Sequence, residues 1–155
     1  MNRKKVIILS VVGGAILLVL LVVGIATLCF WIKTAEHRYY GNHWGIALPK
    51  EAQLVYHTDN LGWMGDGERY SVFDWSGDDD RFLQKLSPAQ KESTEIGSFC
   101  RSTMNQLQVP LAFRLELEDS WLYAKVTDEE WPESDYVYLI YDVDACRLYV
   151  IQTRL

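Results

Sequence analysis

The stretch YVYLIYDVDACRLYVIQT (residues 136–153) decides the predicted fold class. Residues 136–142 and 148–153 are short runs rich in aromatic and β-branched side chains, which favour strands. The segment between them, residues 143–147, has the length of a tight turn. Two strands so close in the sequence pair most simply as an antiparallel hairpin. We therefore expect an antiparallel sheet in this part of the chain.

A second hairpin is expected upstream, from residues 53–59 (QLVYHTD) and 68–75 (ERYSVFDW). Side chains that alternate with a period of two lie on opposite faces of a strand. On the first strand this alternation predicts one face formed by Leu54, Tyr56 and Thr58, opposite Val55 and His57. On the second strand it places Tyr70, Val72 and Asp74 opposite Ser71, Phe73 and Trp75.

One main helix is predicted between the two hairpins. The segment SPAQ (residues 87–90) indicates its start, because serine caps a helix, proline suits the first turn and glutamine completes a reciprocal cap. Pro110 should end the helix, and residues 81–86 fit a shorter helical turn. The apolar stripe expected at helical spacing consists of Ile96, Phe99, Cys100, Met104 and Leu107.

The rest of the C-terminal part is predicted to be mainly strands. Residues 111–117 alternate between apolar and polar side chains, which favours a strand and leaves a short helix as the alternative. Residues 121–126 (WLYAKV) predict another strand. The order strand, strand, helix and then strands is typical of an α+β domain whose antiparallel sheet packs against one or two helices. We expect this domain to occupy residues 45–155.

The N-terminal part predicts a transmembrane helix. Residues 6–32 contain no charged side chain and are longer than the ~20 apolar residues needed to cross a bilayer. A cleaved signal peptide would have a shorter apolar region and a small residue where Leu28 stands. A lipoprotein signal would likewise require a small residue just before Cys29. We therefore expect residues 6–32 to be an uncleaved signal anchor.

The charges that flank this anchor predict its orientation. Arg3, Lys4 and Lys5 precede the apolar run, and the positive-inside bias places them in the cytoplasm. Residues 1–5 would then be cytoplasmic, residues 33–44 an aromatic juxtamembrane segment, and residues 45–155 an extracytoplasmic domain. The expected location is the cell membrane, crossed once, and the expected membrane contact is residues 6–32.

The charge balance narrows the classes of partner. Four of the 15 lysines and arginines precede residue 34, whereas all 21 aspartates and glutamates follow it. An acidic domain disfavours nucleic acid, which requires a basic surface, and permits a protein partner with basic groups. Cys100 and Cys146 are the two cysteines of this domain, and outside the cell they could form a disulfide.

The stretch LGWMGDGERY (residues 61–70) contains three glycines between the two expected strands of the first hairpin. A phosphate-binding loop would have to open a helix, whereas the residues that follow favour a strand. Asp-Gly is a preferred hairpin-turn pair, so we expect a turn here. If the domain recognises a ligand or partner, we expect contacts from this loop through Trp63, Met64, Asp66 and Glu68.

Motifs for catalysis and metal binding are weak. The acidic segment DWSGDDD (residues 74–80) resembles the start of a calcium loop, but Asp79 and Lys85 occupy positions where an EF-hand needs glycine and glutamate. The histidines, His37, His43 and His57, lack the spacing of a zinc site, and no nucleophile motif occurs. We predict no catalytic residue, no metal and no cofactor, with a looser calcium site and acid–base chemistry by loop carboxylates as alternatives.

Two segments, LPKEAQLVYHTDNLGWMGDGERYSVF (residues 48–73) and the C-terminal YVYLIYDVDACRLYVIQT, resemble an uncharacterised family of small proteins of Gram-positive bacteria. Members are lipoproteins or single-pass membrane proteins with a "GDG" loop and an "IYD…LY" hairpin. Met64 stands where the family often has histidine. The resemblance implies an envelope location and this fold, and it implies no activity.

Three function classes follow. The first is a binding or accessory module at the cell surface. The second is an immunity or inhibitor protein that acts on a basic partner. The third is a hydrolase that uses loop carboxylates such as Asp66 and Glu68, with Asp128, Glu129 and Glu130 as further candidates.

Overall fold

The computed structural model describes residues 16–27, 31, 34–88, 94–116 and 121–155. The chain forms two compact units, residues 1–35 and residues 36–155, and each is described by itself. In the first unit, residues 16–27 are helical and their side chains are exposed. Residues 6–15, 28–30 and 32 of the expected anchor lie outside the described part. No helix within the described ranges is both long and apolar enough to cross a membrane.

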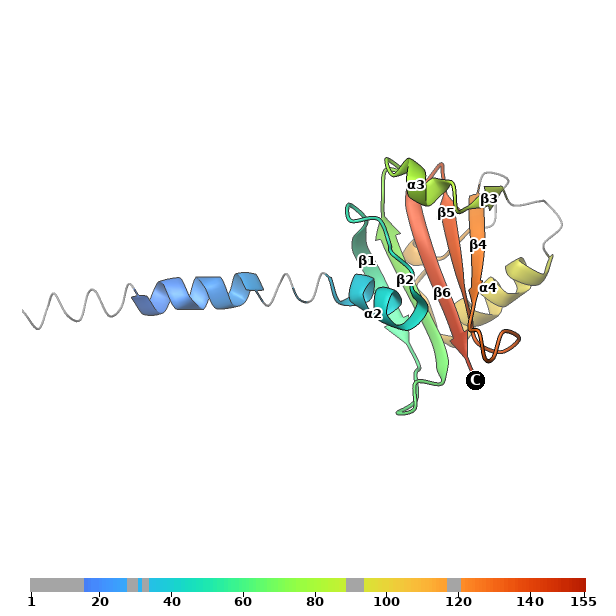
Figure 1. Cartoon of the computed structure of the whole chain (residues 1–155), viewed down its shortest axis with the longest axis horizontal. Coiled ribbons are helices and arrows are strands. Elements are labelled where there is room, and N and C mark those ends of the chain that lie inside the picture. Colours follow the sequence, from blue (N-terminus) through green and yellow to red (C-terminus); the bar gives the residue numbers. More distant parts are fainter. Residues whose placement is uncertain (1–15, 28–30, 32–33, 89–93, 117–120) are drawn as a thin grey trace, which may run out of the picture. The chain divides into compact units, whose positions relative to one another are not determined.

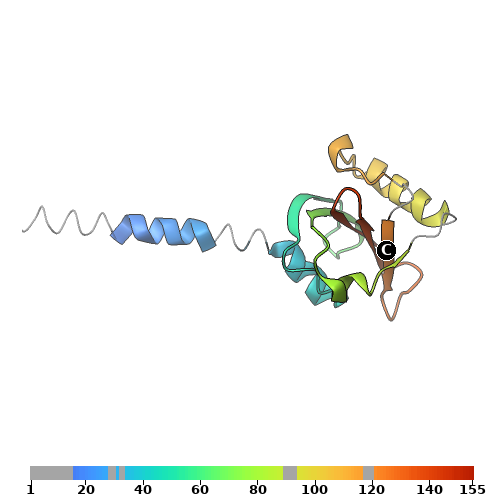
Figure 2. The same cartoon turned by 90° about the horizontal axis from the view of Figure 1, so that it is seen from above.

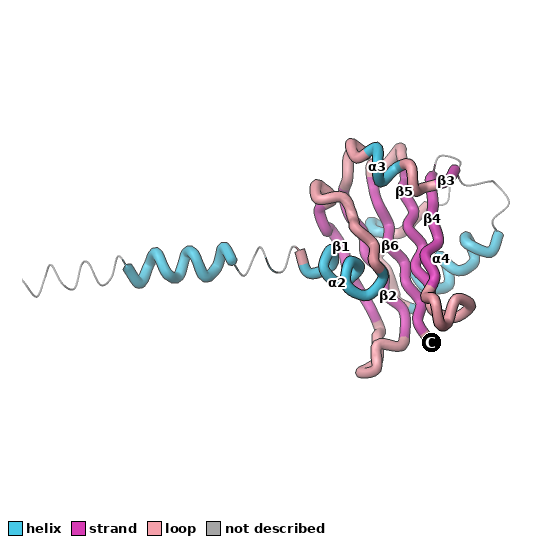
Figure 3. Tube along the Cα trace, in the orientation of Figure 1, coloured by secondary structure: helices cyan, strands magenta, loops and turns pink. Residues whose placement is uncertain are grey.

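The second unit is built around an antiparallel sheet of six strands (Figures 1 and 3). In space the strands follow the order β1-β2-β6-β5-β4-β3. Their bounds are β1 Gln53–Asp59, β2 Gly67–Asp74, β3 Ser87–Pro88, β4 Trp121–Thr127, β5 Tyr136–Asp142 and β6 Arg147–Arg154. The helices are α2 Ala35–Trp44, α3 Asp80–Leu83 and α4 Thr94–Gln106, with a 3-10 turn η1 Leu111–Phe113. The α+β class and the antiparallel sheet are therefore confirmed.

Helices cover both faces of the sheet, with α4 on one face and α2 and α3 on the other (Figure 2). The central strands β2, β5 and β6 are consequently buried on both sides, and each shows a nearly continuous run of buried residues. The middle of β5 (residues 137–141) and of β6 (residues 148–151) is accordingly apolar and aromatic, since a strand covered on both faces has no solvated side.

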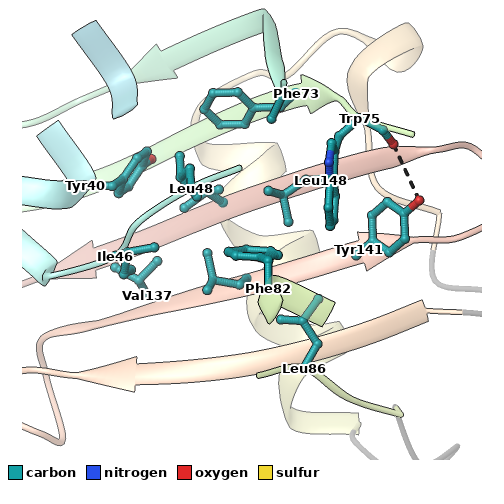
Figure 4. Close-up of a cluster of buried hydrophobic side chains, with 13 residues drawn as sticks. Tyr40, Ile46, Leu48, Phe73, Trp75, Phe82, Leu86, Val137, Tyr141 and Leu148 are labelled. Atoms are coloured by element: carbon teal, nitrogen blue, oxygen red, sulfur yellow. Dashed lines mark hydrogen bonds between the residues drawn. The ribbon is translucent and has the colours of Figure 1, made fainter. Parts of the chain in front are cut away.

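The face under α2 and α3 holds a mainly aliphatic and aromatic core (Figure 4). Trp75 contacts the rings of Phe82 in α3 and Tyr141 in β5, with ring centroids 5.3 and 4.7 Å away. The Tyr141 hydroxyl donates a long 3.5 Å hydrogen bond to the main-chain oxygen of Trp75. These contacts attach the segment after β2 and the short helix α3 to the centre of the sheet.

The opposite face packs against α4 and η1. The predicted stripe of α4 is confirmed, because Ile96, Cys100 and Met104 are buried while Phe99 and Leu107 pack half-buried beside them. From the sheet, Tyr70 and Val72 contribute to the same core, whereas Ser71 and Phe73 lie on the other face, as the alternation predicted. Helix α4 ends at Gln106, before Pro110.

The face predicted for the first strand is wrong at Leu54. An irregularity between Leu54 and Tyr56 shifts the register of β1 against β2. Leu54 therefore packs in the core under α2, and Tyr56 packs in the core under α4. A β-bulge adds one residue to a strand and reverses the alternation beyond it. Val55, at the bulge, is partly exposed.

Two predicted elements differ in the structure. Ser87 and Pro88 pair with β4 as the short edge strand β3 and do not cap a helix, while Ala89 and Gln90 lie outside the described residues. Residues 111–113 form η1, followed by irregular backbone to residue 116. The Tyr70 hydroxyl donates to the oxygen of Phe113 and accepts from the main-chain N–H of Leu115, so a side chain here takes the place of a partner strand.

The compact unit begins at Glu36, earlier than the predicted start near Gly45. Helix α2, expected as a juxtamembrane segment, packs on the sheet through Glu36 and Tyr40, which are both buried. The disulfide that Cys100 and Cys146 could have formed is not present, and both are free thiols. Cys100 faces the sheet from α4, whereas Cys146 is exposed in the turn between β5 and β6.

Candidate functional site

Two hairpin loops leave the sheet at the same end. The register aligns Glu68 of β2 with Thr153 of β6, and Thr153 with Tyr136 of β5. Tyr136 in turn faces Thr127, the last residue of β4. The β1–β2 loop (residues 60–66) and the β4–β5 loop (residues 128–135) therefore begin from the same row of the sheet, beside Leu155 (Figure 1). We call these two loops and Leu155 the loop end.

The β1–β2 loop confirms the turn that was predicted for the GDG segment. The Gly62 N–H donates to the oxygen of Asp66, and the Gly65 N–H donates to the oxygen of Gly62. Gly67 has a φ of 131°, and a Cβ built there would lie 2.9 Å from the main-chain oxygen of Asn60. Only glycine fits such a position without strain. The glycines therefore fold the loop back on itself and do not open a helix.

This loop presents two large apolar side chains to solvent. Trp63 is 97% exposed and Met64 is 73% exposed. Asp66 is exposed in the same loop. The candidate contact residues Trp63, Met64 and Asp66 are thus together at the loop end.

Glu68, the fourth candidate, has a different position. It lies in β2 and accepts a 3.3 Å hydrogen bond from the hydroxyl of Thr103 in α4. Its other carboxylate oxygen is buried without a hydrogen-bond partner. Burial raises the pKa of Glu68 above its ordinary value, and the Thr103 hydrogen bond offsets part of this effect. Glu68 thus faces Thr103 of α4, whereas Asp66 is exposed in the β1–β2 loop.

The β4–β5 loop adds a third large apolar side chain that is exposed, and this residue was not predicted from the sequence. Trp131 is 61% exposed. Asp128 Oδ1 accepts hydrogen bonds from the main-chain N–H groups of Glu130 and Trp131, at 2.8 and 3.1 Å. The Ser134 and Asp135 N–H groups donate to the oxygen of Trp131. The loop is therefore held in a defined turn, and the indole is displayed at its surface.

A buried carboxylate connects the two loops to β6. Asp135 is 3% exposed and accepts a hydrogen bond from the Leu155 N–H at 3.1 Å. Its other oxygen lies 3.3 Å from Arg154 Nε. A Cβ built on Gly65 would lie 3.6 Å from Arg154 Nη1, so the β1–β2 loop runs along this guanidinium. The Arg154–Asp135 pair thus lies between the two loops and attaches the β4–β5 loop to the end of β6.

A second polar cluster lies between α2, β1 and β2. Arg69 donates from Nε and from Nη2 to the two oxygens of Glu36, at 3.1 and 2.5 Å. A third nitrogen of Arg69 donates to Asp59 at 3.1 Å, and the guanidinium lies 3.9 Å from the ring centroid of Tyr39. Burial lowers the pKa of Arg69, but the hydrogen bond and charge of Glu36 more than offset this effect and raise it overall. Arg69 is therefore charged and held by two carboxylates.

The same cluster contains a serine, a histidine and an aspartate. The Ser71 hydroxyl donates to Glu36 Oε2 at 2.9 Å and lies 3.2 Å from His57 Nδ1 and 3.0 Å from the Tyr40 hydroxyl. His57 Nε2 lies 3.0 Å from Asp59 Oδ2. Ser71 is fully buried beneath α2, so no substrate can reach its hydroxyl. A nucleophile must be accessible to its substrate, and we therefore assign this cluster to the attachment of α2.

The acidic segment before α3 also has a structural role. Asp79 Oδ1 accepts hydrogen bonds from the N–H groups of Arg81 and Phe82, which caps the helix. A shallow depression of about 490 Å³ lies beside it, lined by Glu51, Asp78, Asp79, Asp80 and Arg81. In the part of the chain that the structure describes, no group of three or more His, Cys, Asp or Glu side chains has the geometry of a metal site.

Comparison of the chain with protein families, with curated proteins and with solved structures found no match. The family resemblance of residues 48–73 and 136–153 accordingly stays a prediction. The polar cluster was missed from the sequence because Glu36 belongs to a segment assigned to the membrane surface. Alternation along β2 does place Arg69 and Ser71 on one face, and this was the available signal.

Proposed function

We propose that this protein is a membrane-anchored, extracytoplasmic binding module whose contact surface is the loop end. The observation that carries the proposal is the arrangement of the second unit. Both faces of its sheet are covered by helices, and Trp63, Met64 and Trp131 are left at one end in solvent. Exposed tryptophans and methionines are enriched in protein contact surfaces.

The anchor rests on sequence. Residues 6–32 lack charge and are longer than a bilayer requires, and basic residues precede them. Helical backbone over residues 16–27 is compatible with this proposal. The acidic character of the remaining chain supports a soluble surface that does not adhere to anionic lipid.

A hydrolase receives less support. Asp66 is exposed in a loop, whereas Glu68 faces Thr103 on another element. Ser71 and His57 are close, but the Ser71 hydroxyl is buried under α2 and cannot reach a substrate. Binding therefore remains the function that the geometry supports best.

The location is tested with the free thiol of Cys146, which is exposed, whereas Cys100 is buried. A membrane-impermeant maleimide added to intact cells should label a Cys29→Ala variant of the full chain at Cys146. A Cys146→Ser variant of the same protein is the matched control and should not be labelled. Labelling of Cys146 that requires prior permeabilisation of the cells would place the domain in the cytoplasm and refute the proposed location.

A further inference from the structure

We infer that the loop end binds a protein with a basic surface, an inference that rests on the binding function proposed above. Within the loop end the exposed carboxylates are Asp66, Glu129, Glu130 and Glu133. In the described part of the chain, Arg154 lies among them but is paired with the buried Asp135, and Lys125 of β4 lies over the Tyr136 ring, with Nζ 4.1 Å from its centroid, so four exposed carboxylates outnumber the nearby cations. The surface around the three apolar side chains is therefore acidic.

The apolar side chains are spaced as in a protein interface. Trp63 and Met64 come from the β1–β2 loop, and Trp131 comes from the β4–β5 loop, with β6 between the two hairpins. Neighbouring strands lie about 4.8 Å apart, so the hairpin midpoints are separated by roughly 15 Å. One side of a standard protein interface covers about 800 Å². A single partner can therefore contact both tryptophans, which commonly act as binding hot spots.

The loops are ordered before any partner arrives. Asp128 fixes the turn that displays Trp131, and Asp135 ties this loop to the end of β6. Hydrogen bonds between Gly62, Gly65 and Asp66 fold the other loop. Loops that are already ordered lose less conformational entropy on binding, which favours affinity.

The acidic charge of the loop end favours a basic protein over two other binding partners, an anionic membrane and a second copy of this chain. An anionic lipid surface attracts basic segments and repels acidic ones, so the carboxylates around Trp63 and Trp131 oppose insertion into such a membrane. A second copy of this chain would bring the same acidic residues against each other, which costs free energy. A basic protein surface gains from both the apolar anchors and the charges, because complementary potentials speed association and favour the correct partner.

The test is site-specific photo-crosslinking with the full chain in cells of its native host. Benzoylphenylalanine is placed at Trp63, at Trp131 and, as the control, at Val143. Val143 is 45% exposed and lies in the turn at the opposite end of the sheet. We expect adducts to one and the same basic protein from positions 63 and 131, and none from position 143.

A second part of the crosslinking experiment tests whether the exposed carboxylates of the loop end contribute to binding. The triple variant Glu129→Gln, Glu130→Gln and Glu133→Gln should reduce the adduct yield about tenfold, in keeping with the usual scale of electrostatic steering. These side chains are exposed, so the variant should unfold at the same temperature as its parent. The inference is overturned by adducts to lipid or to a second copy of this chain, by equal yield at position 143, by the absence of adducts, or by a yield that the triple variant leaves unchanged.

The two proposals can fail separately. Suppose that the impermeant maleimide labels Cys146 in intact cells but that no adduct forms at position 63. This result would refute the basic partner and leave the proposed extracytoplasmic location intact. A basic protein captured at positions 63 and 131 while Cys146 is shielded from the reagent in intact cells would refute the location and support the partner.

Discussion

Arg154 Nε lies 3.3 Å from Asp135 Oδ2, and this pair joins the end of β6 to the loop between β4 and β5. The carboxylate is buried, and it also accepts hydrogen bonds from the Leu155 N–H and the Ser134 hydroxyl. Through these contacts the pair holds the β4–β5 loop against the end of β6 and so contributes to the shape of the loop end. The proposed binding surface is therefore supported by a buried carboxylate whose cationic partner, Arg154, is partly exposed.

The Asp135→Asn variant should loosen the loop end. Asparagine keeps one acceptor for the Leu155 N–H but leaves Arg154 without its charged partner, which should cost about 1–3 kcal/mol. Chemical denaturation would measure the loss, and hydrogen exchange at Asp128 and Leu155 would locate it. The exposed Glu133 of the same loop supplies the control, since Glu133→Gln should change the free energy of unfolding by under about 0.5 kcal/mol. Equal stability of the two variants would contradict the role of the pair.

The Glu36–Arg69 pair should hold α2 on the sheet. Glu36→Gln leaves the Arg69 guanidinium largely buried without its main counter-charge, and such a loss typically costs about 3 kcal/mol. Arg69→Met in the same background should restore part of the stability, because the uncompensated charge is then removed. A double-mutant cycle by urea denaturation measures the coupling. Independent, additive effects of the two substitutions would show that the contact does not stabilise the domain.

Glu68 should make stability depend on pH. Its pKa in the folded protein is raised above the ordinary value of 4.5, chiefly by burial. From pH 4.5 up to the raised pKa the folded state binds more protons than the unfolded state, so stability falls as pH rises through this window. Glu68→Gln keeps an acceptor for Thr103 and should be more stable than its parent at pH 7, by under about 1 kcal/mol because the group is partly solvated.

Thermal unfolding between pH 4 and pH 7 measures this difference. Glu129→Gln is the control for the removal of one exposed carboxylate. The interpretation fails if Glu68→Gln and its parent lose stability in parallel as the pH rises.

Gly67→Ala should strain the β1–β2 loop. At a φ of 131° a side chain is unfavourable, and the added Cβ would meet Asn60 at 2.9 Å. We expect a loss of roughly 1–3 kcal/mol, the usual scale for such backbone strain. Gly41 in helix α2 offers a matched control, because a Cβ there has its nearest contact at 3.9 Å. Gly41→Ala should be neutral or should stabilise the helix by up to ~1 kcal/mol.

The central sheet could be predicted from the sequence because its signals are local. Strand β5 has the predicted bounds, β6 extends one residue beyond its prediction at each end, and the Asp-Gly turn after β1 is present. The face of Leu54 could not be predicted, because a bulge depends on how β1 pairs with β2. Residues 111–116 have a strand-like pattern, but the Tyr70 hydroxyl binds their backbone from another element.

In the candidate site, too, residues with a local sequence signal were predicted, and residues placed by tertiary contacts were not. Trp63 and Met64 were predicted as contact residues because a glycine-rich loop indicates an exposed turn. Trp131 was missed, since its place beside that loop follows from the register of four strands. Glu36 was missed because its partner, Arg69, lies on another element and the pairing is visible only in three dimensions.

Thiol footprinting at position 64 measures directly whether a partner covers the loop end in cells. In the Cys29→Ala background, Met64→Cys places a thiol in the exposed loop, and Cys146 serves as the internal reference at the opposite end of the sheet. An impermeant maleimide should label Cys146 at the same rate in intact cells and in the purified protein, and should label residue 64 more slowly in cells because a partner covers it. Equal rates at residue 64 in cells and in the purified protein, with Cys146 labelled in both, would contradict a binding surface at the loop end.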